Sequence, residues 1–118
     1  MKIKIKFSTK IIGTLLLGGL AGGSVRAGDD VNAIWDTNCA ACHGQDGKGK
    51  TMMGRRLDIK DLTDAKVQAA FDDPLATKTI KEGVTVNGTE KMKAFGDKLS
   101  DDEIKALVAR VRSFKPAP

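Results

Sequence analysis

The chain has 118 residues and a formal net charge of +5, with 20 Lys and Arg against 15 Asp and Glu. Residues 1–27 contain five basic and no acidic residues, so the rest of the chain carries 15 of each. This balance, together with an aromatic content of 4%, excludes the basic, aromatic-rich surface typical of nucleic-acid binding. Beyond residue 27 there is no repeat, linker or low-complexity tract, so we expect one small domain whose own core is marginal.

The N-terminal segment has the pattern of a secretory signal peptide. Four lysines among the first ten residues form a basic start, residues 11–25 are apolar or small, and Val25 and Ala27 precede an expected cleavage point. The apolar run is shorter than the roughly 20 residues that span a membrane, and glycines interrupt it. We therefore predict a signal peptide over residues 1–27, an exported, periplasmic domain over residues 28–118, and no stable membrane insertion after cleavage. An uncleaved membrane anchor is the alternative.

A short amphipathic helix is expected over residues 31–38, and it leads directly into a Cys-x-x-Cys-His motif. This motif, Cys39-Ala40-Ala41-Cys42-His43, is the attachment sequence for covalently bound c-type haem. On a helical turn, residues three and four apart share a face, so the two thiols and the imidazole project to one side. The motif therefore predicts electron transfer, with Cys39 and Cys42 as covalent haem attachments and His43 as the proximal iron ligand.

Three alternatives to an electron carrier remain open at this point. A haem protein with a labile sixth ligand would act as a peroxidase or a gas sensor. Two cysteines in an exported chain can also form a disulfide, or belong to a Cys-x-x-Cys thiol-disulfide oxidoreductase, although the latter normally needs a βαβ context that this sequence lacks. A structural zinc site needs about four ligands, whereas the two Cys and the single His supply three.

Glycines and capping residues divide the middle of the chain. Residues 44–50 contain three glycines, which predicts a loop after the motif. We expect one helix capped by Thr63, and another that Asp73 and Pro74 open and Gly83 ends. Both helices are short and amphipathic.

The last helix has the clearest start signal in the chain. Ser100 and Glu103 form a capping box, and Leu99 with Ile104 can form a hydrophobic staple across it. An apolar stripe runs along the helix at Ile104, Leu107, Val108 and Val111. Little of the sequence alternates as a strand would, so we predict an all-α fold.

Together these features resemble the small class I cytochromes c over nearly all of residues 30–115. The resemblance is carried by Trp35 four positions before the first Cys, by the motif with Gly44, by the glycine-rich loop, and by the stretch from Met92 to Ile104. It implies a small cytochrome c-like fold in which three to five short helices surround one covalently bound haem c with its iron. The first and last helices are expected to cross.

The resemblance also implies a methionine on the distal side of the haem. Met92 lies in the extended segment before the last helix and is the expected distal iron ligand, with Met52 and Met53 as competitors. A thioether favours ferrous iron, so His/Met ligation raises the reduction potential relative to two nitrogen ligands. With both axial positions occupied, the implied function is a one-electron carrier and not an enzyme.

The sequence departs from the family pattern at several positions. Lys93 follows the expected distal ligand, where many members have a Pro that stiffens the loop. Between His43 and Pro74 there is no Pro whose carbonyl could accept the imidazole Nδ1 proton, so we expect another backbone carbonyl, near Gly54, to orient the ring. Arg110 occupies a position where members often have an aromatic residue, and the chain has no Tyr.

Basic residues flank the candidate iron ligands. Arg55 and Arg56 are candidate partners of the haem propionates, and a solvated pair of arginines is the alternative. Lys and Arg also gather within residues 44–60 and 91–98, where we expect them to attract acidic redox partners to an exposed haem edge unless they are ordinary solvated side chains. The expected partners are redox proteins, such as membrane respiratory complexes or a dedicated dehydrogenase.

Overall fold

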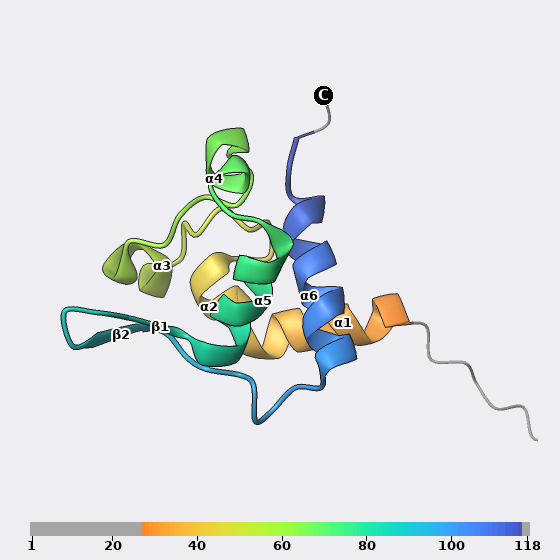
Figure 1. Cartoon of the computed structure of the whole chain (residues 1–118). Coiled ribbons are helices and arrows are strands. Elements are labelled where there is room, and N and C mark those ends of the chain that lie inside the picture. Colours follow the sequence, from red (N-terminus) through yellow and green to blue (C-terminus); the bar gives the residue numbers. More distant parts are fainter. Residues whose placement is uncertain (1–26, 117–118) are drawn as a thin grey trace, which may run out of the picture.

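The computed structural model describes residues 27–116, so the predicted signal peptide, apart from its last residue, lies outside the described residues. The helices are α1 (Ala27–Asn38), α2 (Ala40–His43), α3 (Met52–Leu57), α4 (Ala65–Ala69), α5 (Asp73–Glu82) and α6 (Asp101–Ser113). Two short strands, β1 (Val84–Val86) and β2 (Thr89–Met92), lie between α5 and α6. Figure 1 shows α6 crossing α1 and lying beside α5, while α3 and the two strands project to one side. Within residues 27–116 no helix has the length and apolar character needed to cross a bilayer.

The predicted helical architecture is confirmed, with one small addition. β1 and β2 pair antiparallel as a hairpin, whose turn residues Asn87 and Gly88 have φ values of 50° and 76°. Two successive positive φ angles are what a two-residue type I′ turn requires, and Asn-Gly is the pair that favours it. The sequence analysis expected no strand, because segments of three and four residues are too short for their alternation to stand out.

Six helical segments, rather than three to five, occur between residues 27 and 116 because two very short ones join the expected set. One is α2, a single turn separated from α1 by Cys39 alone. The other is α3, which follows the glycine-rich loop and begins at Thr51 as its N-cap. Neither is long enough for an apolar period to show in the sequence.

Two helix starts differ by one residue from the prediction. α4 is capped by Asp64 and not by Thr63, because Thr63 donates from its backbone and its hydroxyl to the Asp61 carboxylate. These hydrogen bonds lower the pKa of Asp61. α5 is capped by Asp72, whose carboxylate accepts from the first turn, and it ends at Gly83 as predicted.

The core forms where α1, α5 and α6 meet. The predicted capping box starts α6, with Ser100 Oγ accepting from Glu103 N at 3.2 Å and the Glu103 carboxylate accepting from Ser100 N at 2.7 Å. The predicted apolar stripe of α6 faces inward, and Leu99 packs against the same cluster. The buried apolar residues are Trp35, Leu62, Ala76, Ile80, Phe95, Ile104, Leu107 and Val108.

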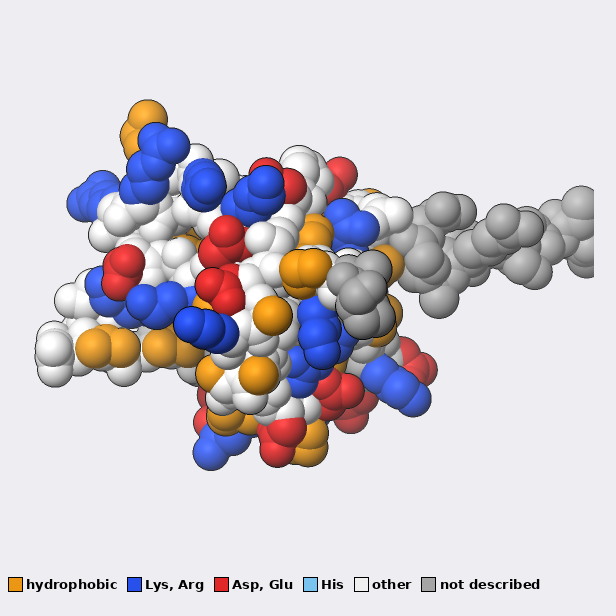
Figure 2. Space-filling view, turned by 90° about the horizontal axis from the view of Figure 1, so that it is seen from above, with side chains coloured by type: hydrophobic (Ala, Val, Ile, Leu, Met, Phe, Trp, Pro, Cys, Tyr) orange, Lys and Arg blue, Asp and Glu red, His pale blue; other side chains and the backbone are white. Residues whose placement is uncertain are grey.

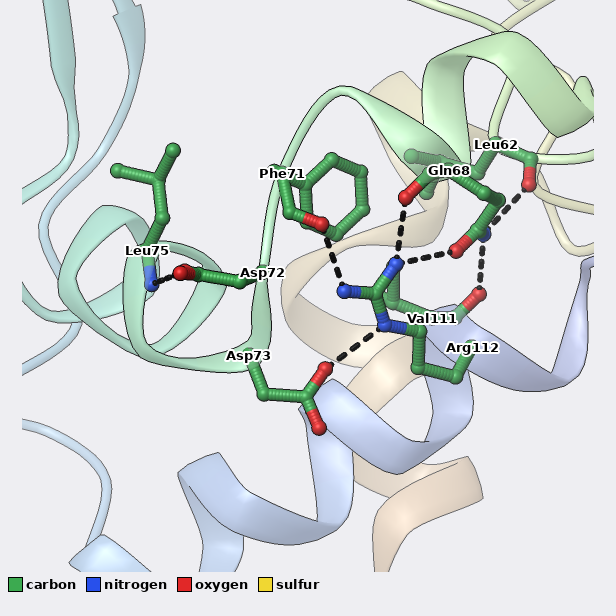
Figure 3. A network of polar contacts seen from close by, with 8 residues as sticks. All are labelled: Leu62, Gln68, Phe71, Asp72, Asp73, Leu75, Val111 and Arg112. Atoms are coloured by element: carbon green, nitrogen blue, oxygen red, sulfur yellow. Dashed lines mark hydrogen bonds and ion pairs between the residues drawn. The ribbon is translucent and has the colours of Figure 1, made fainter.

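A polar network joins the end of α6 to α4, to the start of α5 and to the segment between them (Figure 3). The Arg112 guanidinium donates to both oxygens of Gln68, at 2.7 and 2.9 Å. It also donates to the Phe71 carbonyl and to the Asp73 carboxylate, each at 2.8 Å, and lies 4.4 Å from the centre of the Phe71 ring. Gln68, only 2% exposed, donates in turn to two backbone carbonyls. The network therefore pairs the buried amide and fixes the segment that carries Phe71 against α6.

Replacing Arg112 with Met should destabilise the domain by about 2–3 kcal/mol, because the buried oxygens of Gln68 and the carbonyl of Phe71 lose a charged donor. For a domain of this size the melting temperature should fall by roughly 10–20 °C. Lys105→Met, at an exposed position of the same helix, is the control and should change stability by less than about 0.5 kcal/mol. Equal melting temperatures for the two variants would contradict the assignment.

Candidate functional site

The Cys-x-x-Cys-His motif forms the single turn of α2 at the end of α1. Cys39 N donates to Trp35 O at 2.8 Å, and His43 N donates to Cys39 O at 2.9 Å. Gly44 ends the turn with φ +78°, a conformation that favours glycine. The Trp35 indole Nε1 donates to the Gly44 carbonyl at 3.0 Å. Trp35 therefore holds both the start and the end of the motif.

The start of α3 supports the motif from the other side. Thr51 Oγ1 donates to the carbonyl oxygens of Ala41 at 2.8 Å and Cys42 at 3.1 Å, and accepts from Gly54 N at 2.8 Å. A Cβ on Gly54 would overlap the Gly49 carbonyl oxygen and would lie 2.5 Å from the Cys42 carbonyl oxygen. Only glycine at this position therefore lets α3 approach the motif so closely.

An apolar cavity of about 240 Å³ lies beside the motif. Cys39 and His43 contribute to its lining from the motif, and Met92, the last residue of β2, contributes from the hairpin. Cys42 is partly buried but does not line the cavity. The other lining residues are mostly aliphatic and aromatic, among them Phe71, Ile80, Phe95 and Leu107.

The His43 imidazole is partly buried, with its ring centre 5.8 Å from that of Trp35. Burial lowers the pKa of His43, which favours the uncharged form that binds metal ions. Its Nδ1 is buried without a hydrogen-bond partner in the described part of the chain. The expectation that a carbonyl near Gly54 orients the ring is therefore wrong: the Gly54 carbonyl accepts from Ile59 N at 2.9 Å instead.

The thiol environment argues against the alternatives to a haem site. Cys39 and Cys42 are free thiols, and burial, followed by the nearby Cys42, raises the pKa of Cys39 to about 11. The attacking thiol of an oxidoreductase needs a lowered pKa, so this environment is the opposite of the one required. No group of three or more His, Cys, Asp or Glu between residues 27 and 116 is arranged to hold a metal ion, which leaves a zinc site unsupported.

The methionines and arginines singled out in the sequence fall in different places. Met92 lines the cavity, whereas Met52 is 86% exposed and Met53 40% exposed on α3, away from the lining. Arg55 and Arg56 are exposed on the same helix, do not line the cavity, and form no ion pair with any residue from 27 to 116. Their role as partners of haem propionates stays a prediction.

The donor set of the cavity fits a haem c. A partly buried thiol and an uncharged imidazole lie on the motif side, a thioether lies on the hairpin side, and the intervening wall is apolar. Thiols, imidazole and thioether are the attachment and axial groups that c-type haem uses, and an apolar wall suits the porphyrin ring.

No local sequence pattern marks the cavity wall as functional. Phe71, Phe95 and Leu107 carry only the pattern of apolar residues at helical or local spacing, which marks any core position. Their contribution to the site follows from the contacts between α5, α6 and the hairpin, which no local signal describes.

Replacing Thr51 with Val should lower the stability of the domain by about 1–3 kcal/mol, because one isosteric change leaves the Ala41 and Cys42 carbonyls and the Gly54 N–H without their partner. Denaturant unfolding of the haem-loaded protein measures this change. Thr37→Val, on the exposed face of α1, is the matched control and should cost under about 0.5 kcal/mol. The support by Thr51 is refuted if both variants unfold at the same denaturant concentration.

Comparison with known proteins agrees with this fit. The family described as cytochrome C oxidase, cbb3-type, subunit III matches residues 26–109. A curated relative, the Cbb3-type cytochrome c oxidase subunit FixP of Azorhizobium caulinodans, is 36% identical over 98 residues, which cover 83% of this chain and 31% of the relative. The chain therefore spans about a third of that protein's length.

Solved structures give the same result for the fold. The KustC0563 c-type cytochrome aligns with a TM-score of 0.62 and 36% identity, over 72% of this chain and 96% of that one. A point mutant of that cytochrome aligns with a TM-score of 0.64 and 37% identity, over 73% and 99% of the two chains. The resemblance to small mono-haem cytochromes c is confirmed. The chain belongs to the cytochrome c family of the cbb3-type oxidase subunit III, a membership that implies haem c and haem-based electron transfer.

Proposed function

We propose that this domain is a periplasmic one-electron carrier that holds a single haem c through thioether bonds from Cys39 and Cys42, with His43 and Met92 as axial iron ligands. The observation that carries the proposal is that His43 of the motif and Met92 of the hairpin, far apart in the sequence, line one apolar cavity together with Cys39.

Each residue of the site has a distinct task in this mechanism. Haem c, when bound, supplies the one-electron change between ferric and ferrous iron. Cys39 and Cys42 tether the ring to α2, and His43 presents an uncharged imidazole from the same turn. Met92 supplies a soft thioether that favours the ferrous state. The apolar wall would keep water away from a bound haem, and with His43 and Met92 both holding the iron no position would remain for a substrate, so the domain would carry electrons without catalysing a bond change.

Redox proteins are the proposed partners. The curated relative is a subunit of a cbb3-type oxidase, which supports a partner among membrane respiratory complexes. A dedicated dehydrogenase is the alternative partner. The basic start, apolar run and small residues of the N-terminal segment support export to the periplasm and release from the membrane after cleavage.

The distribution of charge supports acidic partners. Figure 2 shows Lys and Arg side chains gathered at the end of the molecule that α3 and the hairpin form in Figure 1. In the basic stretches 44–60 and 91–98, the exposed residues Lys48, Lys50, Arg55, Arg56 and Lys93 form no ion pair with another residue between positions 27 and 116, whereas Lys60 pairs with Asp58. Unpaired cations near the candidate ligands attract a negatively charged protein over long range.

The protein matured in the periplasm should keep its pigment in acidified organic solvent and display a reduced c-type α-band. The ferric form should also display the weak near-infrared charge-transfer band of Met-ligated haem. Met92→Ala should lose this band and retain the covalent pigment, because only the distal ligand is removed. Met52→Ala, at an exposed site, is the control. A colourless protein would refute the haem site, and rapid carbon monoxide binding by the unaltered ferrous protein would favour a gas sensor or peroxidase over a carrier.

Electron exchange with an acidic redox protein should slow as ionic strength rises from about 0.01 to 0.15 M, because the Debye length shrinks from about 30 to 8 Å. Stopped-flow mixing of the two proteins measures this rate. Exchange with a small uncharged reagent is the control and should depend little on salt. If the rate of electron exchange with the acidic protein did not change with ionic strength, steering by the basic end of the domain would be contradicted.

A further inference from the structure

The backbone around Met92 packs unusually closely on the end of α5. Gly83, the C-cap of α5, has φ +74°, and a Cβ on it would lie 2.5 Å from the Met92 carbonyl oxygen and 2.8 Å from Ala94 N. Real Cβ atoms do not approach backbone atoms to these distances. Any side chain at position 83 would therefore push the Met92–Ala94 backbone away from α5.

The same segment is tied to α5 further along. Phe95 N donates to the Ile80 carbonyl at 2.9 Å, and Gly96 N donates to the Lys81 carbonyl at 3.1 Å. A Cβ on Gly96 would lie 3.0 Å from that Lys81 oxygen, so this second approach is also close. The backbone from Met92 to Gly96 thus runs along the last turn of α5. Two hydrogen bonds hold it there, and Gly83 and Gly96 allow the close approach because they have no Cβ.

A bulge in the hairpin determines the direction in which Met92 faces. Thr85 pairs with Glu90 and Val84 pairs with Met92, so Lys91 is an extra residue in β2. In a regular strand, Glu90 and Met92 would share one face, because side chains alternate with a period of two. The extra residue reverses this relation, and Glu90 is exposed whereas Met92 lines the cavity.

We propose that the glycines at positions 83 and 96 position Met92, by allowing the backbone of residues 92–96 to pack directly on the end of α5, and that this packing keeps the thioether directed into the cavity. The inference rests on the proposed role of Met92 as the distal ligand. Lys93 does not itself restrict the backbone φ angle after Met92 as a Pro at this position would. Rigidity at Met92 therefore comes from contacts with α5 and not from the loop sequence. Gly83 and Gly96 act as positioning residues, with no contact of their own to the iron.

Gly83→Ala, measured in the haem-loaded protein, tests the proposal. The added Cβ displaces residues 92–94, so imidazole should compete better for the ferric iron, with an affinity at least about tenfold higher than in the unaltered protein, equivalent to about 1.4 kcal/mol. The near-infrared band of Met ligation should weaken in parallel. Gly88→Ala is the control for an added side chain at a positive φ, because its φ is +76° and no atom lies within 4 Å of the added Cβ. This control should retain the imidazole affinity and the band of the unaltered protein.

The outcomes distinguish a failure of the proposed Met92 ligation from a failure of the positioning role of Gly83. If the unaltered protein lacks the band, or Met92→Ala retains it, the proposed ligation fails. If the ligation holds but Gly83→Ala and Gly88→Ala bind imidazole equally, the positioning role of Gly83 is overturned. Should Gly83→Ala yield no haem-loaded protein, Gly96→Ala decides, since it applies a gentler push at 3.0 Å without a positive φ. A severalfold gain in imidazole affinity supports the proposal, and an unchanged affinity overturns it.

Discussion

Both sides of the candidate haem site depend on backbone packing that only glycine permits. Gly54 lets α3 lie against the carbonyls of the motif, and Gly83 lets the Met92 segment lie against the end of α5. In each case a Cβ would meet backbone atoms, which cannot move aside as a flexible side chain can. The distance between the motif and the hairpin therefore depends on two residues that carry no functional group. In a small domain with few buried apolar residues, such contacts fix the positions of the backbone segments that carry the site, and a larger core is not needed for this.

The sequence was sufficient to propose most residues of the candidate site, and it predicted the fold in outline. Cys39, Cys42 and His43 form a local motif, so their spacing alone carries the chemistry. The capping box at Ser100 gives the start of α6 for the same reason. In both cases the residues lie close together in the sequence, so the pattern can be recognised without knowledge of the tertiary structure.

The features that the sequence did not reveal depend on segments far apart in the chain. The polar network of Arg112 joins α6 to residues about 40 positions earlier, and no spacing rule connects them. No spacing rule gave the hydrogen bonding of His43 Nδ1 either: this atom has no partner between residues 27 and 116, and the Gly54 carbonyl accepts from Ile59 N. The hairpin is a different case: Asn87-Gly88 was a valid local signal, but its strands were too short to reinforce it.

Trp35 has a consequence beyond its hydrogen bond to the motif. It is the only tryptophan in the chain, and its ring centre lies 5.8 Å from that of His43. A haem attached beside His43 would accept excitation energy from an indole at so short a range, so native protein would emit little ultraviolet-excited fluorescence. Trp35 lies only four residues before Cys39, so even a fully extended chain keeps the indole within about 14 Å of the point of haem attachment, and unfolding leaves the emission quenched. The indole emission would therefore report whether haem has been attached to the chain, and not whether the chain is folded.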